Sequence, residues 1–108
     1  MRSYYTVTKV EKNKYRFSLV AGNHEIILTS EDYTTEVACF NGINSVRKHC
    51  SDRSNYVVDQ DRLFFMLRAK NHVEIGRSQL YSSMQDLEKG IEAVMRAGAT
   101  HEFKVKKE

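Results

Sequence analysis

The chain has 108 residues, of which 29% are charged and 41% hydrophobic, a composition typical of folded soluble proteins and unlike that of disordered chains. Its formal net charge of +3 falls short of the strong basic footprint of a dedicated nucleic-acid binder. No apolar run reaches membrane-spanning length and the first residues lack a signal-peptide core, so we expect a cytoplasmic protein with no membrane contact.

Three strands are predicted in the first part of the chain. Residues 3–10 are rich in β-branched and aromatic types, which favour a strand. Residues 15–21 alternate apolar and polar side chains with the period of a half-buried strand. Polar turns at 11–13 and 22–24 separate these strands from each other and from a third strand at 26–28. Turns this tight predict antiparallel neighbours.

A helical pattern follows, and then a second round of the same elements. The hydroxyls of Thr34 and Thr35 precede the first helix and can accept hydrogen bonds from its free N–H groups. After a short connection at 51–55, strands are predicted from residue 56, over 63–69 and over 73–78. A second helix and a last strand at 102–106 complete the chain.

The second round repeats the first at an offset of 48 positions. From Phe17 onward the pairs align without a gap, and Tyr33 falls on Tyr81. Identities that keep one register across strand, turn and helix patterns indicate a duplication. Other matched residues are Phe17 with Phe65, Leu19 with Leu67, Asn23-His24 with Asn71-His72, Ser30 with Ser78, and Gly42-Ile43 with Gly90-Ile91.

Both helices carry one apolar stripe with steps of four, three and four residues. The stripes are Cys39, Ile43, Val46 and Cys50 in the first helix and Leu87, Ile91 and Val94, closed by Gly98, in the second. Ser82 with Gln85 has the spacing of a capping box. Gly42 and Gly90 lie beside the stripes although a mid-helix glycine costs about 1 kcal/mol relative to alanine. We therefore expect a steric need, such as close approach of helix to sheet.

The pattern predicts an α+β fold. The element order is three strands, helix, three strands, helix, strand, and both helices should cover one face of a mostly antiparallel sheet. Each half is near the size at which a single core becomes marginal, so the halves should share one core. We predict one domain over residues 1–108, built of repeats at about 1–52 and 53–108, and a monomer that is a pseudo-dimer within one chain.

Two groups of residues resemble the repeats of the YegP-like family. The first is Ala21-Gly-Asn-His-Glu-Ile-Ile-Leu-Thr-Ser-Glu-Asp-Tyr33 with Asn41-Gly-Ile-Asn-Ser-Val46. The second is Ala69-Lys-Asn-His72 with Ile75-Gly-Arg-Ser-Gln-Leu-Tyr-Ser-Ser83 and Gly90-Ile91. The family consists of small bacterial proteins with a β3-α-β unit, present in tandem or as a homodimer. The resemblance implies one continuous sheet in which the units exchange their last strands, here 54–60 and 101–107. It implies no activity, substrate or cofactor, so no functional residue is carried over.

The repeated Asn-His pair is one candidate site. Asn23-His24 and Asn71-His72 stand at matching turns, and Asn and His both tolerate left-handed backbone. A hairpin-tip role therefore accounts for both copies without a ligand, and we favour it. The alternative is an anion or metal site made by the imidazoles of His24 and His72, which requires the two tips to lie close together.

The sheet face without helices is a second candidate. If Leu63, Phe65 and Leu67 face the helices, the opposite face gathers Lys14, Arg16, Arg62, Phe64, Met66, Arg68 and Lys70. Cations beside an aromatic ring on an open sheet are features of single-stranded RNA platforms, so weak nucleic-acid binding is one hypothesis. Interspersed acids favour an ordinary solvated face instead. Phe64 and Met66 would also suit a protein contact or an oligomer interface.

No pattern in the sequence predicts catalysis or a cofactor. Cys39 and Cys50 would lie about three turns, or roughly 16 Å, apart on one helix, which is too far for a disulfide. Cys39 takes the place of Leu87 and should be buried, whereas Cys50 at the helix end should be partly exposed. The sequence has no zinc spacing, P-loop or GxGxxG. We expect a small bacterial interaction or structural module that is not an enzyme and that contacts a protein partner.

Overall fold

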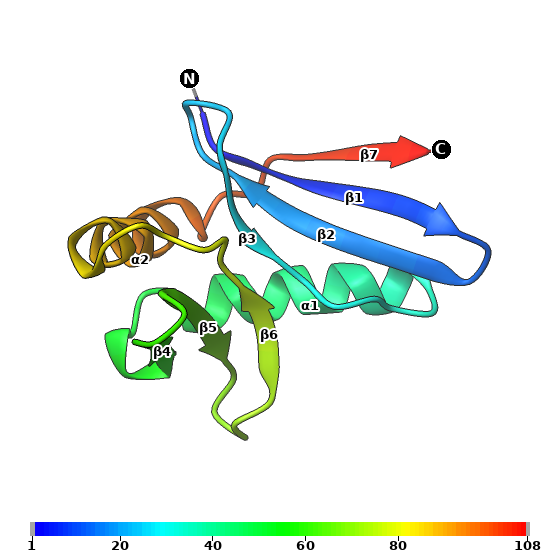
Figure 1. The fold of residues 1–108 in the computed structure, drawn as a ribbon. Helices are drawn as coiled ribbons and strands as arrows, with labels where there is room; N and C mark the ends of the chain where they lie inside the picture. The colour runs from blue at the N-terminus through cyan, green and yellow to red at the C-terminus, as the bar shows by residue number, and fades with distance from the viewer. Residues whose placement is uncertain (1, 108) are drawn as a thin grey trace.

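The computed structural model describes residues 2–107, which form seven strands and two helices (Figure 1). The first repeat contains β1 Tyr4–Glu11, β2 Lys14–Val20, β3 Ile26–Thr29 and α1 Glu36–His49, followed by a 3-10 turn at Arg53–Asn55. The second contains β4 Tyr56–Asp59, β5 Phe64–Arg68, β6 Glu74–Arg77 and α2 Met84–Ala97, followed by β7 Phe103–Lys107. The predicted order of elements is confirmed. Neither described helix is long and apolar enough to cross a membrane.

All seven described strands belong to one sheet, in the order β4-β5-β6-β3-β2-β1-β7. Neighbours are antiparallel except β1 and β7, which are parallel. The strand after each helix joins the opposite half, because β4 follows α1 and pairs with β5 while β7 follows α2 and pairs with β1. The exchanged strands and the two helices on one face are therefore confirmed (Figure 1).

The two halves meet where β3 lies beside β6. One pair of residues, Thr29 and Arg77, is in register there, and the two are 48 positions apart in the sequence. They are equivalent members of the two repeats, so the approximate two-fold axis of the fold passes through this pair. We refer to this junction of β3 and β6 as the seam.

Each helix begins at a hydroxyl side chain. Thr35 Oγ1 accepts a hydrogen bond from the Ala38 N–H at 3.0 Å, and Ser83 Oγ accepts one from the Asp86 N–H at 3.1 Å. The capping box predicted from Ser82 is wrong by one residue, because Ser82 donates to the Asp86 carboxylate instead. Both apolar stripes are confirmed, and their fully buried side chains are Cys39, Ile43, Val46, Leu87, Ile91 and Val94.

The two mid-helix glycines make room for tyrosine rings. Tyr33 and Tyr81 stand just ahead of the helices, and a Cβ at Gly42 or Gly90 would overlap the hydroxyl of the tyrosine in its own repeat. Each ring stacks on a buried phenylalanine of the sheet, with centroids 6.1 Å apart in the first repeat and 6.2 Å in the second. The expected steric need exists, and the group that creates it is chiefly the tyrosine inserted between helix and sheet.

Two buried tyrosines tie strands to the helix ends. The Tyr5 hydroxyl donates to the Gly98 carbonyl and the Tyr56 hydroxyl to the Cys50 carbonyl, each at 2.7 Å. Tyr56 is in register with Leu67 just as Tyr5 is with the equivalent leucine of β2. Tyr56 thus takes the structural place of Tyr5 although it lies 51 positions on, because the β4–β5 hairpin is three residues shorter than the β1–β2 hairpin.

Cys50 differs from the sequence-based expectation. Its side chain is 1% exposed rather than partly in solvent. The reason is the position of α2, whose end lies against it: a Cβ at Gly98 would come within 2.6 Å of Cys50 Sγ. One hydrophobic cluster includes this cysteine together with strand and helix residues of both repeats.

Candidate functional site

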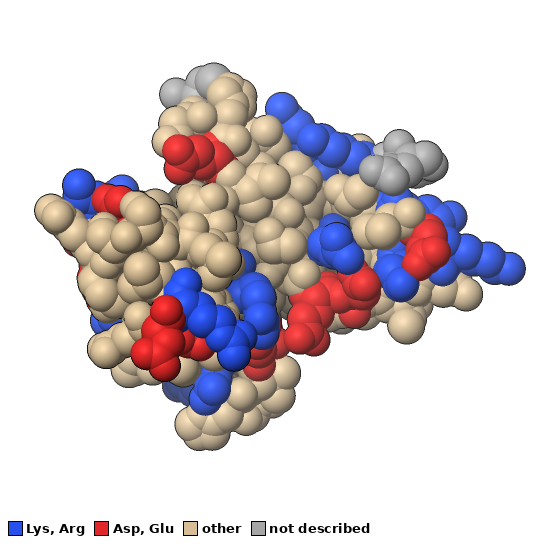
Figure 2. All heavy atoms as spheres, viewed as in Figure 1, with Lys and Arg blue, Asp and Glu red and all other residues tan. Residues whose placement is uncertain are grey.

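The face of the sheet without helices carries most of the residues selected from the sequence. In Figure 1 the helix α1 passes behind β3 and β6, so the space-filling view of Figure 2 shows this helix-free face. Cationic and acidic side chains are interspersed over it and separated by uncharged surface (Figure 2). The face therefore does not present one continuous basic patch.

Phe64 is covered rather than exposed as a stacking platform. Its side chain is 7% exposed, although the sequence suggested a surface hydrophobe. The Arg77 guanidinium lies over the ring with its Cζ 5.3 Å from the centroid, and the same group reaches the Met66 sulfur at 3.9 Å. Arg77 reaches both because it is in register with Met66 across β5 and β6. Sequence reasoning missed Arg77, because steps of two from the buried Ile75 place it on the helix side. The irregular register of β5 and β6 between Leu67 and Arg68 turns it to the helix-free face instead.

Cations near the seam are held by neighbouring carboxylates. Arg16 pairs with Asp32 at 2.7 Å and Arg77 pairs with Glu74 at 2.8 Å. The hydrogen bonds that the Arg77 guanidinium donates to the Glu74 carboxylate raise the pKa of the guanidinium. These guanidinium groups are therefore fixed in position while part of their donor fork remains open to a ligand.

The other cations predicted for this face differ in whether a carboxylate pairs with them and in where they lie. Lys14 pairs with Glu11 at 2.6 Å, and this contact raises the pKa of the Lys14 ammonium. Arg62 lies in the β4–β5 turn, where its side chain is 75% exposed, rather than on a strand. Arg68 and Lys70 form no ion pair within 4.0 Å in the part of the chain that the structure describes.

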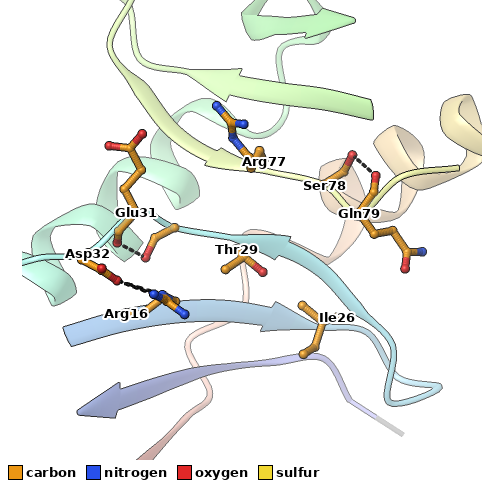
Figure 3. Close-up of a pocket in the computed structure, with 9 residues that line it drawn as sticks. Arg16, Ile26, Thr29, Glu31, Asp32, Arg77, Ser78 and Gln79 are labelled. Carbon is orange, nitrogen blue, oxygen red and sulfur yellow. Dashed lines mark hydrogen bonds and ion pairs between the residues drawn. The ribbon is translucent and has the colours of Figure 1, made fainter. Parts of the chain in front are cut away.

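A groove of about 530 Å³ opens on the helix-free face along the seam (Figure 3). It contains the two residues at the pseudo-two-fold axis, and the stretches 29–32 and 77–79 supply opposite walls. We refer to it as the seam groove. Its lining residues are Arg16, Ile26, Thr29, Ser30, Glu31, Asp32, Arg77, Ser78 and Gln79.

The two serine hydroxyls of the seam groove are already used by the fold. Ser30 Oγ accepts from the Phe17 N–H at 2.9 Å and donates to the Glu31 carbonyl at 2.7 Å. Ser78 makes the same two bonds in the second repeat. These serines directly follow β3 and β6, and the partners of their hydroxyls among the described residues are backbone groups. The chemical groups that remain for a ligand are the guanidiniums of Arg16 and Arg77, the carboxylates of Glu31 and Asp32, the Thr29 hydroxyl, the Gln79 amide and the Ile26 side chain.

The two Asn-His turns do not come together. His24 and His72 have φ of 69° and 67°, the left-handed backbone expected of hairpin tips. Asn23 Oδ1 accepts from the N–H two residues on at 3.1 Å, and Asn71 Oδ1 does so at 3.2 Å. The β2–β3 tip and the β5–β6 tip lie at opposite ends of the molecule (Figure 1).

Comparison with known proteins gives the family. The model of the family described as "Domain of unknown function (DUF1508)" matches the chain twice, over residues 11–56 and 60–104. The chain belongs to the DUF1508 family. A UPF0339 protein of Acinetobacter baylyi is 46% identical over 103 residues, 93% of either chain. The UPF0339 protein YegP of Escherichia coli K12 is 37% identical over 107 residues, 96% of this chain and 97% of YegP.

Solved structures of DUF1508 relatives have the same fold. The solution NMR structure of a UPF0339 protein from Shewanella oneidensis has a TM-score of 0.87 at 39% identity, covering 97% of this chain and 92% of that one. The solution NMR structure of YegP from E. coli has a TM-score of 0.89 at 36% identity, covering 99% and 95%. The YegP-like resemblance and the tandem-repeat fold are therefore confirmed.

The thiols of this DUF1508 chain are not poised for chemistry. Cys39 is fully buried, and burial together with Glu36 raises the pKa of its thiol to about 11. Burial also raises the pKa of the Cys50 thiol. A nucleophilic cysteine needs the opposite shift. Among the residues described, no three His, Cys, Asp or Glu side chains are grouped so that they could hold a metal ion.

Proposed function

We propose that this protein is a non-catalytic binding module that contacts a protein partner through its helix-free sheet face, with the seam groove at the centre. The observation that carries the proposal is the groove itself, which combines fixed charges of both signs with an apolar side chain, Ile26, that is 52% exposed. A protein surface offers matching groups of both charges and an apolar contact, which is the usual composition of such interfaces.

The same geometry favours a protein over a nucleic acid. The carboxylates of Glu31 and Asp32 share the groove with its cations, and they would repel a phosphate backbone. The aromatic ring on which a base would stack, Phe64, is covered by Arg77. Serines that serve the fold and thiols with raised pKa support a binding role rather than catalysis.

Site-specific photo-crosslinking in a bacterial host tests this proposal. A benzoylphenylalanine at Ile26 is expected to form a discrete protein adduct, whereas one at Lys89 on the exposed side of α2 is expected to form none. Glu31→Arg introduced beside the Ile26 probe should abolish the adduct, because it reverses one charge of the groove. Identical adducts from both probe positions would contradict the proposal.

A nucleic-acid assay distinguishes the protein-binding proposal from the nucleic-acid hypothesis. We expect no retention of the purified protein on single-stranded RNA at physiological salt. Retention that falls steeply with salt, and that falls further in Arg16→Ala/Arg68→Ala, would replace the protein-binding proposal with the nucleic-acid hypothesis.

A further inference from the structure

A second cavity lies at the far end of the second repeat, between the 3-10 turn before β4 and the turn after β5. Its volume is about 460 Å³, within the range of small-molecule sites. It shares no residue with the seam groove. We refer to it as the β4–β5 cavity. Its lining residues are Asp52, Ser54, Asn55, Val57, Arg68, Ala69, Lys70 and His72.

The charge of the β4–β5 cavity is predominantly positive. Arg68 and Lys70 face it without an ion pair among the described residues, and His72 adds an imidazole. The one carboxylate is Asp52, whose Oδ1 accepts from the Ser54 N–H at 2.9 Å and from the Ser54 hydroxyl at 2.7 Å. Those bonds, with a smaller contribution from Lys70, lower the pKa of Asp52. The cavity therefore presents two cationic side chains without an ion pair and an imidazole beside one carboxylate.

The first repeat shows that the fold does not need these cations. Val20 and Gly22 occupy the positions of Arg68 and Lys70 at the offset of 48. In the register of the first hairpin, Tyr4 lies opposite Val20 and its ring carries the Lys104 ammonium 4.4 Å from the centroid. The duplicated scaffold therefore folds with a version of the same corner in which an aromatic ring and one ammonium replace the Arg68 and Lys70 side chains.

The aromatic ring is missing in the second repeat. The residue that takes the place of Tyr4 at the strand offset of 51 is Asn55, whose amide donates to the His49 carbonyl at 2.9 Å. A short amide that is turned to the helix end leaves the corner open, and cations surround the opening. The second repeat thus differs from the first both in the open space at this corner and in the cations around it.

We propose that the β4–β5 cavity binds a small organic phosphate. The Arg68 guanidinium suits bidentate contact with phosphate oxygens, and Lys70 and His72 supply further donors. The half-buried Val57 and Ala69 form an apolar wall against which the organic part of the ligand packs. This site is independent of the proposed protein contact and uses different residues.

Amide-resolved NMR titration of the full chain tests the assignment. Phenyl phosphate is the probe, inorganic phosphate is the comparison without an organic part, and sodium chloride keeps the ionic strength constant. We expect saturable shifts at Ser54, Asn55, Ala69 and His72, with phenyl phosphate binding more tightly than inorganic phosphate. Arg68→Val/Lys70→Gly installs the residues of the first repeat and should weaken phenyl phosphate binding by about tenfold or more.

A matched control removes the same number of cations from other turns. Lys12→Ala/Arg62→Ala should leave phenyl phosphate binding unchanged, and both double variants should keep the dispersed amide spectrum of the parent. Equal loss of binding in the two double variants would show that only net charge matters and would overturn the site. Unsaturable shifts, or inorganic phosphate binding as tightly as phenyl phosphate, would overturn the organic-phosphate assignment.

Discussion

Tyr81 occupies the space that a methyl group at Gly90 would need. A Cβ there would lie 2.6 Å from Tyr81 Cζ and would overlap the hydroxyl. The Tyr81 ring is stacked on Phe65 with an interplanar angle of 11°, so Phe65 prevents the ring from moving toward the sheet to make room for the Cβ. A glycine at this point in a helix costs about 1 kcal/mol relative to alanine, and the tyrosine contact has to outweigh that cost.

Gly90→Ala is therefore expected to lower the free energy of unfolding by about 1–3 kcal/mol, as overpacked substitutions do. Urea denaturation followed by circular dichroism measures it. In a Tyr81→Ala background the overlap is gone, and the same glycine substitution should raise the free energy of unfolding by about 1 kcal/mol through helix propensity. The same sign in both backgrounds would show that Tyr81 is not the reason for the glycine.

At the scale of elements, each helix is held at its end by a strand tyrosine. The Tyr5 hydroxyl in β1 donates to the carbonyl of Gly98, the C-cap of α2. The Tyr56 hydroxyl in β4 donates in the same way to the carbonyl of Cys50, the C-cap of α1. Helix ends leave carbonyls without partners inside the helix, so these bonds satisfy buried acceptors that the helix itself cannot. They also link α1 to β4 and α2 to β1.

Tyr5→Phe should lower the free energy of unfolding by about 1–3 kcal/mol, because it leaves the buried Gly98 carbonyl without its donor. Tyr4→Phe is the matched control on the opposite face of β1. Its ring contact with Lys104 survives the substitution, so the change in stability should be close to zero. Chemical denaturation of both variants distinguishes them, and equal losses would contradict the role given to the Tyr5 hydroxyl.

Most elements could be predicted from the sequence because their signals are local. Alternation located the strands, and the apolar stripes located both buried helix faces. The first residue of α2 was missed because Ser82 and Ser83 are both competent caps, and the path of the chain out of β6 selects Ser83. The shorter β4–β5 hairpin was hidden because the gap-free offset begins only at Phe17. The pairing of Tyr56 with Leu67 reveals it.

For the whole molecule, exchanged strands make each half depend on the other. The radius of gyration of 13.1 Å is the value of about 13 Å expected for one folded unit of about 100 residues. One hydrophobic cluster contains Ile43 of α1 and Ile91 of α2, which are equivalent in the two repeats. We therefore infer that both repeats unfold together.

Ile43→Val and Ile91→Val test this cooperativity. Each removes one methylene from a site that is at most 1% exposed, so each should lower the free energy of unfolding by about 0.5–1.5 kcal/mol. Both should shift a single transition that is seen alike by tyrosine circular dichroism and by amide hydrogen exchange in either half. Two transitions, each sensitive to one of the substitutions, would contradict a common unit.

The surfaces were predicted less completely than the core. Alternation placed Arg16, Met66 and Arg68 on the helix-free face, but the seam groove depends on how β3 and β6 meet across 48 residues of chain. The burial of Phe64 depends on Arg77 from the neighbouring strand. Neither contact has a local signal in the sequence, because both arise only when the two repeats are joined.

The number of strands has a further consequence. β4 serves both as the strand that follows α1 and as the strand that precedes β5, so the described sheet has seven strands where two separate β3-α-β units would supply eight. A sheet with an odd number of strands cannot be superposed on itself by a two-fold rotation about an axis that lies between two strands. The equivalent strands β1 and β4 therefore differ: β1 lies between β2 and β7, whereas β4 pairs with β5 alone among the described strands. The end of the sheet at β4 and β5 therefore lacks the extra strand that β7 supplies beside β1, and Arg68 and Lys70 lie at that end.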